Sequence, residues 1–131
     1  MKMSRKYLLI MVTCCLVIFG LAACGGNETS SNTTCSNTSA TFTQDGTINV
    51  QDNCFDPKEV KVPANVAVKV TFVNKGKTVH IVEIKGLTSE ETLQPGQNKL
   101  FTLTAKEQSY KMYDELFESQ GMTGIYQGVK Q

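Results

Sequence analysis

The sequence is poor in the side chains that most enzyme active sites need. It contains one histidine, His80, among 131 residues, and a single imidazole supplies little general-base capacity. It has no paired Ser and His, no His-Glu metalloprotease motif and no glycine-rich phosphate loop. We therefore expect that the protein is not an enzyme.

The sequence also lacks a large excess of charge of either sign. Its 13 Lys and Arg residues face 12 Asp and Glu residues, with no basic stripe. Loss of an N-terminal leader carrying Lys2, Arg5 and Lys6 would leave 10 basic against 12 acidic residues, a net charge near −2. This balance gives no support for nucleic-acid binding. We expect a monomer that binds no nucleic acid.

Long apolar runs are confined to the N-terminus. Residues 1–23 begin with basic residues and continue with an almost wholly apolar run, which is typical of a secretory signal peptide. The run ends in Leu21-Ala22-Ala23-Cys24, which resembles the lipobox of bacterial lipoproteins. The resemblance implies lipid on Cys24 and an extracytoplasmic protein anchored to the bacterial cell membrane. An uncleaved membrane helix is the alternative, but the run is short for a span of about 20 residues.

The segment after this cysteine lacks large apolar side chains. Residues 24–40 are rich in Ser, Thr and Asn, which predicts a flexible tether before a domain at 41–131. With lipid expected on Cys24, Cys35 and Cys54 are the two other cysteines of the exported part. They could form a disulfide that stabilises the domain by about 2–4 kcal/mol. The other interpretation is that Cys54 is a metal-binding thiolate.

The domain contains short runs of alternating apolar residues separated by turn signals, which predicts strands. The run at 78–84 places His80, Val82 and Ile84 on one face. Seven such alternating runs are present, at 47–51, 59–62, 66–74, 78–84, 98–104, 109–114 and 125–129. Seven or eight strands in a chain of this length indicate one all-β sandwich or barrel with a single core.

One segment admits a second interpretation. Residues 105–118 are rich in helix formers, and Tyr110, Tyr113 and Phe117 recur at helical spacing. We expect a strand as far as Tyr113 and then a short helical turn near 114–119. A helix through the whole segment is the alternative.

Several short motifs together resemble the cupredoxin family. They are Asn53-Cys54-Phe55-Asp56-Pro57, the run 70–74, His80, Pro95-Gly96, Tyr110 and Gly121-Met122-Thr123-Gly124. The resemblance covers residues 47–129 and implies a Greek-key β-sandwich. It also implies a copper site in which the first imidazole ligand is His80 and the axial thioether is Met122.

The sequence departs from the cupredoxin pattern at the two other ligand positions. Asp114 stands where the family has the ligand cysteine, and Phe117 stands where it has the second histidine. A blue-copper centre needs two imidazoles, a thiolate and a weak axial thioether. The departure predicts a site that is not blue and that favours Cu(II) or another divalent ion over Cu(I).

A narrower resemblance comes from Cys54 before Phe55 and from the run 82–86, which are similar to the cupredoxin-like domain of EfeO-type proteins associated with bacterial iron uptake. It implies a copper or iron site formed by His80, Asp114, Met122 and Cys54. Glu83 and Glu118 are alternative or supporting ligands. A structural role is the alternative to ligation: Met122 could belong to the hydrophobic core, and the carboxylates could lie on solvent-exposed faces.

Two functions follow from these alternatives. The first is a surface-anchored metal-binding lipoprotein that captures copper, most readily Cu(II), or iron and presents it to a metal-transport or redox partner. The second is an accessory or interaction domain that has kept the cupredoxin fold without a metal. Loss of metal binding in His80→Ala distinguishes the first from the second.

Overall fold

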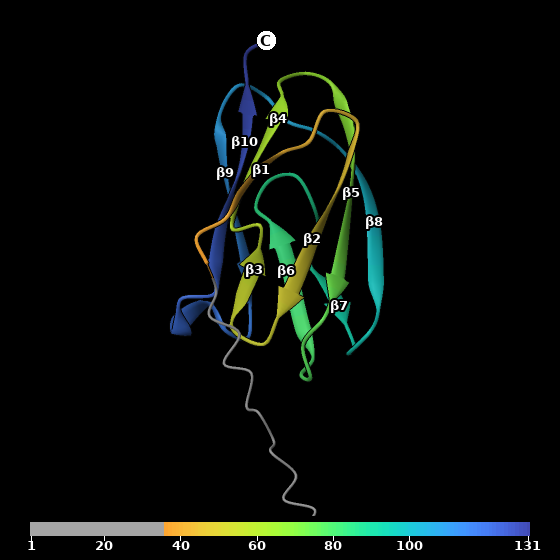
Figure 1. Ribbon diagram of the computed structural model, residues 1–131, viewed down its shortest axis with the longest axis vertical. Coiled ribbons are helices and arrows are strands. Elements are labelled where there is room, and N and C mark those ends of the chain that lie inside the picture. Colours follow the sequence, from red (N-terminus) through yellow and green to blue (C-terminus); the bar gives the residue numbers. More distant parts are fainter. Residues whose placement is uncertain (1–35) are drawn as a thin grey trace, which may run out of the picture. The chain divides into compact units, whose positions relative to one another are not determined.

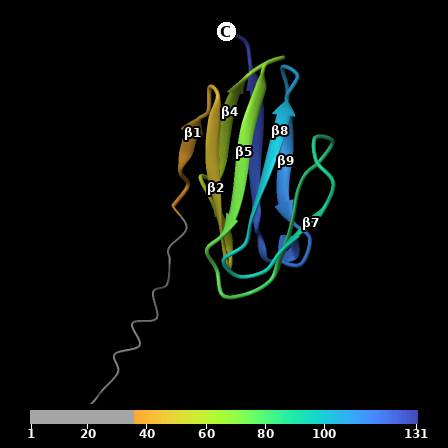
Figure 2. The same ribbon diagram turned by 90° about the vertical axis from the view of Figure 1, so that its right-hand side faces the viewer.

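The computed structural model describes residues 36–131, which form two facing β-sheets (Figures 1 and 2). The predicted signal peptide, Cys24 and Cys35 lie outside the described residues. In chain order the elements are β1 (Ser39–Thr41), β2 (Asp45–Gln51), β3 (Cys54–Asp56), β4 (Glu59–Pro63), β5 (Ala67–Asn74), β6 (His80–Ile84), β7 (Glu91–Leu93), β8 (Asn98–Thr104), β9 (Ser109–Asp114), η1 (Glu118–Gln120) and β10 (Thr123–Val129).

The two sheets divide the strands unequally. One has the order β1-β4-β10-β9-β6-β7, and the other has the order β3-β2-β5-β8. Within the first sheet β10 pairs parallel to β4 and antiparallel to β9. The predicted all-β sandwich is thereby confirmed. No helix among residues 36–131 is long and apolar enough to cross a membrane.

Each of the seven predicted strands is present, and three more strands of three residues each bring the total in the described chain to ten. β1 begins at Ser39, inside the segment assigned to the tether, because Ser39 and Ala40 pair in parallel with Glu59 and Val60. The added strands are too short for an alternating pattern to be recognised.

The segment at 105–118 is a strand followed by a turn. β9 buries Tyr110, Met112 and Asp114 on one face, so packing between the sheets overrides the local helix propensity. The helical turn is the 3₁₀ element η1, which lies four residues later than the predicted start. A helix through the whole segment is excluded.

The core between the sheets is largely aliphatic and aromatic. Phe72 packs edge-on against Phe55 and Phe101, with ring centroids 6.4 and 6.0 Å away. Burial raises the pKa of Tyr126 to about 12, and its hydroxyl is the one buried side-chain polar atom in the described chain without a hydrogen-bond partner. The remaining buried polar side chains, Asn74, His80 and Asp114, belong to the site described next.

Candidate functional site

His80 occupies the first position of β6, at the end of the sandwich where the loop between β5 and β6 and the loop after β9 lie (Figure 1). Its side chain is fully buried, as are Val82 and Ile84 on the same face of the strand. The alternation predicted for this strand is therefore observed. An imidazole in such a place needs hydrogen-bond partners for both ring nitrogens.

The first partner is Asp114, the last residue of β9. His80 Nδ1 lies 2.7 Å from Asp114 Oδ2, and both side chains are 0% exposed. The register places Asp114 opposite Val82, so two residues 34 positions apart in sequence meet between neighbouring strands. A carboxylate at this distance accepts the Nδ1 hydrogen and leaves Nε2 to face the other side of the ring.

The second oxygen of Asp114 is occupied by the backbone. Asp114 Oδ1 accepts hydrogen bonds from the N–H groups of Leu116 at 2.9 Å and Phe117 at 3.1 Å. The carboxylate therefore shapes the loop after β9 while it orients the imidazole. Both of its oxygens have a donor from this chain.

Asn74, the last residue of β5, supports the strand that carries the histidine from the other side of the loop between β5 and β6. Its Nδ2 donates to the carbonyl oxygens of Thr78 at 2.8 Å and Leu93 at 2.9 Å, and its Oδ1 accepts from Gly76 N at 2.9 Å. Since all its polar atoms are satisfied, this buried amide fixes the start of β6.

The Nε2 side of the ring faces Thr78 and Asp52. Thr78 Oγ1 lies 3.3 Å from His80 Nε2, and Asp52 Oδ1 lies 3.9 Å from it. Partial burial raises the pKa of the Asp52 carboxyl, but hydrogen bonds from Lys77 and Thr78 and the nearby imidazole bring it below its ordinary value of 3.8. Asp52 is thus an anion that holds the loop between β5 and β6 by accepting hydrogen bonds from Lys77 N, Thr78 N and Thr78 Oγ1.

Phe117 covers the face of the imidazole. The two ring centroids are 5.3 Å apart with an angle of 53° between the planes. In the cupredoxin pattern this position carries the second imidazole ligand, and here it carries an apolar ring that excludes water from the His80–Asp114 pair. The backbone of Phe117 is held as well, because its N–H donates to Asp114 Oδ1.

Met122 follows Gly121, which ends η1 in the left-handed conformation with φ of 91°. Its side chain is 1% exposed and belongs to the hydrophobic core. Its backbone pairs with the same loop, since Met122 N donates to Phe117 O at 3.2 Å and Met122 O accepts from Asp114 N at 3.3 Å. The backbone of Met122 therefore lies beside Asp114.

Cys54, at the start of β3, is buried and disulfide-bonded. A sulfur in a disulfide is not a thiolate ligand, so Cys54 does not extend the set of donors around His80. Its partner is not among residues 36–131, and the pairing with Cys35 stays a prediction.

The two predicted supporting carboxylates are engaged elsewhere on the first sheet. Glu83 lies on the face of β6 opposite to His80 and accepts a hydrogen bond from Tyr113 Oη. Glu118 forms an ion pair with Lys111. Neither contacts the His80–Asp114 pair.

We predict that Glu83→Gln will lower the pKa of Tyr113 from about 12 toward the ordinary value of 10.0. The hydrogen bond to Glu83 is the main cause of the raised pKa, with burial and the charges of Glu83, Glu90 and Glu118 adding to it. Because the folded pKa is raised, the bond's stabilisation is complete below pH 10 and is lost as the pH rises through about 12. Ultraviolet titration of the phenolate measures this shift.

Tyr126 is the internal control for that titration, because its pKa of about 12 comes from burial alone. Its ionisation should be unchanged in Glu83→Gln. An unchanged titration of both tyrosines would contradict the role given to Glu83.

A copper centre does not fit the residues present. The only imidazole in the described chain, His80, is hydrogen-bonded through Nδ1 to Asp114, and both oxygens of Asp114 are engaged. Phe117 has no donor atom to offer. In residues 36–131 no group of three or more His, Cys, Asp or Glu side chains is placed to hold a metal ion.

Sequence reasoning missed Asp52 and Thr78 as neighbours of the imidazole. Thr78 could have been found, since it lies in the predicted strand at 78–84 and residues two apart on a strand share a face; in the structure it precedes β6. Asp52 gave no local signal, because it precedes His80 by 28 positions and meets the loop between β5 and β6 only in the folded sandwich.

Comparison with known proteins agrees with the fold described above. A family model described as a cupredoxin-like domain matches residues 14–125. The structure of dithionite-reduced auracyanin from the photosynthetic bacterium Roseiflexus castenholzii aligns with a TM-score of 0.55 and 22% identity, covering 67% of this chain and 97% of that one. No curated protein matches the sequence significantly.

A second similar structure contains copper. It is the metal-binding domain of the Streptococcus pneumoniae D39 Cu(I)-exporting P-type ATPase CopA with Cu(I), with a TM-score of 0.60 and 12% identity. The alignment covers 72% of this chain and 99% of that domain. At these identities the two structures establish the fold alone.

Proposed function

Since the chain belongs to the family of cupredoxin-like domains, we propose that it is an extracytoplasmic lipoprotein, anchored through Cys24, that acts as a metal-independent binding module and not as an enzyme. The observation that carries the proposal is the 2.7 Å contact between His80 Nδ1 and Asp114 Oδ2. A hydrogen bond within the chain stands where the family places its copper.

Electrostatics supports the metal-independent module. A divalent ion between His80 and Asp114 would be enclosed in a fully buried site with one carboxylate to balance two positive charges. Burying an uncompensated charge is costly, whereas the carboxylate of the existing pair accepts hydrogen bonds from His80 and from the backbone N–H groups of Leu116 and Phe117. The pair therefore performs structurally what a bound ion would do, which is to join β6 to the loop after β9.

The partner we propose is a redox or metal-transport protein at the membrane surface. The loop after β9 presents Leu116, which is 49% exposed, next to the half-buried ring of Phe117. Exposed apolar side chains at one rigid end of a domain are suited to docking against a protein surface. Asp114 holds both residues in place through their backbone N–H groups.

Metal capture is the second candidate. It would use His80, Asp114 and Met122 for Cu(II) or iron, as the likeness to EfeO-type domains implies. The observation in its favour is that an imidazole and a carboxylate already lie together beside the backbone of Met122. A metal would have to displace the proton that joins them.

Unfolding experiments with added metal distinguish the two candidates. We expect that Cu(II), Cu(I) and Fe(III) will leave the unfolding temperature of the purified protein unchanged. A ligand at 100 times its Kd would raise the free energy of unfolding by about 2.7 kcal/mol. Calorimetric titration beside His80→Ala and Asp114→Ala completes the test. Stoichiometric tight binding that both substitutions abolish would overturn the metal-independent module and establish metal capture.

A further inference from the structure

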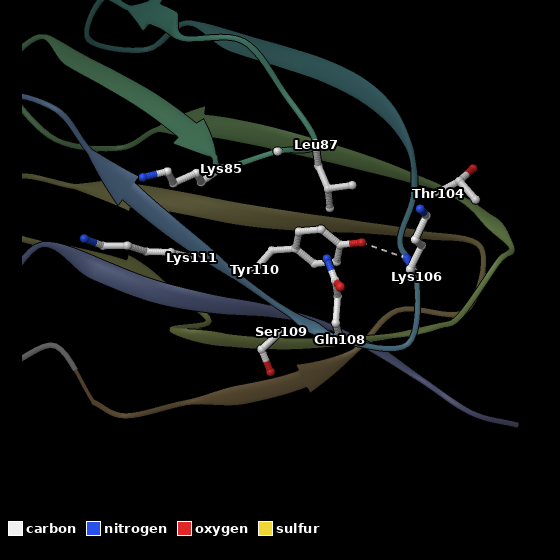
Figure 3. Close-up of a pocket in the computed structure, with 9 residues that line it drawn as sticks. Lys85, Leu87, Thr104, Lys106, Gln108, Ser109, Tyr110 and Lys111 are labelled. Atoms are coloured by element: carbon white, nitrogen blue, oxygen red, sulfur yellow. Dashed lines mark hydrogen bonds between the residues drawn. The ribbon is translucent and has the colours of Figure 1, made fainter.

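A second candidate site lies at the other end of the sandwich, where β6 ends and the β8–β9 turn begins (Figures 1 and 3). It is a hollow of about 490 Å³, open to solvent on one side. This volume falls within the range of about 300–1,000 Å³ that is usual for small-molecule sites. Strands β6 and β9 lie between this hollow and His80, which is not among the residues that line it.

The hollow is positively charged. Three of its lining residues are lysines, Lys85, Lys106 and Lys111, and no lining residue is Asp or Glu. Lys111 is paired with Glu118, whereas Lys85 and Lys106 form no ion pair within residues 36–131. Figure 3 shows the side chain of Lys85 extending away from Tyr110, so Lys106 is the unpaired lysine beside the tyrosine, and its charge gives a local field that attracts anions.

The floor combines an apolar surface with a hydrogen-bond donor. Tyr110, 8% exposed, and the half-buried Leu87 lie at its centre (Figure 3). Tyr110 Oη accepts the backbone N–H of Lys106 at 2.9 Å. Because the oxygen is used as an acceptor, its own hydrogen remains available for donation into the hollow.

The turn beside Tyr110 is held in a fixed shape. Gln108 N donates to Lys106 O at 2.8 Å, and Gly128 N donates to Gln108 O at 3.0 Å. At Gly128 a side chain would collide with the carbonyl oxygen of Lys106, so glycine allows β10 to pass directly beneath this turn. The lysine, the amide of Gln108 and the tyrosine hydroxyl are therefore presented on a rigid frame.

We propose that this hollow binds an organic phosphate ester. The phosphate would lie beside Lys106, with donors from Tyr110 and Gln108, and the apolar body would cover Leu87. Lysine is a well-suited phosphate partner as a compact charge. The hollow is larger than a bare phosphate needs, and its apolar centre favours an ester that brings carbon with it.

Such an ester has two sources, a soluble metabolite or a lipid headgroup. Calorimetry with glycerol 3-phosphate and with dihexanoyl phosphatidate below its micelle concentration distinguishes them. We expect both to bind and glycerol to show no heat. Tighter binding of the phosphatidate would identify the headgroup, and equal binding would identify a soluble ester. Failure of both phosphate esters to bind would overturn the proposal.

The matched variants are Lys85→Gln/Lys106→Gln and Lys69→Gln/Lys75→Gln, which remove the same charge inside and outside the hollow. The first should weaken phosphate-ester binding at least about tenfold, and the second by less than about twofold. Amide NMR spectra report folding of each variant and should shift at Leu87 and Gln108 on titration of the unmodified protein. Equal weakening in the two double variants would mean non-specific charge attraction and overturn the site.

Discussion

Replacing Asp114 with alanine should lower the free energy of unfolding by about 3–5 kcal/mol, the usual cost of removing one partner from a buried pair. The substitution leaves His80 Nδ1 without an acceptor in a fully buried position. It also removes the acceptor for the N–H groups of Leu116 and Phe117. Denaturation in urea, followed by circular dichroism, measures the loss.

The control for this prediction is Asp114→Asn, which keeps the size of the side chain and one acceptor oxygen. It should cost less than the alanine variant, because one of the two sets of hydrogen bonds survives. A cycle with His80→Ala isolates the contribution of the pair, since neighbouring residues that interact do not add independently. A loss below about 1 kcal/mol in Asp114→Ala would contradict the structural role assigned to the carboxylate.

The strands were predictable from sequence because their side chains alternate. The run from Val68 to Phe72 and the run from His80 to Ile84 each bury every second residue, so period and face could be read directly. β3 and β7 have three residues each, too few for a period, and exist only because longer neighbours supply their hydrogen bonds. The helix propensity of residues 105–118 was overridden by the burial of Tyr110 and Met112.

The candidate site was predictable in its members but not in their bonding. The sequence identified His80 and Asp114, and their register in β6 and β9 brings them together. Whether a carboxylate at that position ligates a metal or accepts a hydrogen bond from the imidazole depends on a distance of 2.7 Å, which no sequence pattern encodes. The same holds for Asp52, whose approach to the imidazole depends on the shape of a loop distant in sequence.

Restoring the family ligands should create the copper site that the cupredoxin pattern describes. In Asp114→Cys/Phe117→His, a thiolate and a second imidazole would join His80, and Met122 already follows in the loop. We expect Cu(II) affinity to rise at least about a thousandfold, about 4 kcal/mol, with the intense visible absorption of copper bound to thiolate. Copper titration followed by absorption spectroscopy measures both effects.

Two partial variants separate the contribution of the thiolate from that of the second imidazole. Asp114→Ser/Phe117→His supplies the imidazole without the thiolate and should bind copper without the intense band. Phe117→His alone keeps Asp114 bonded to His80, so its gain in affinity should be small. If the full double variant folds and yet binds no copper, the loop from Glu115 to Gly121 does not have the geometry of a copper loop. The site would then differ from a copper site in the conformation of this loop as well as in its ligands. The hydrogen bonds from the N–H groups of Leu116 and Phe117 to Asp114 hold the loop in that conformation.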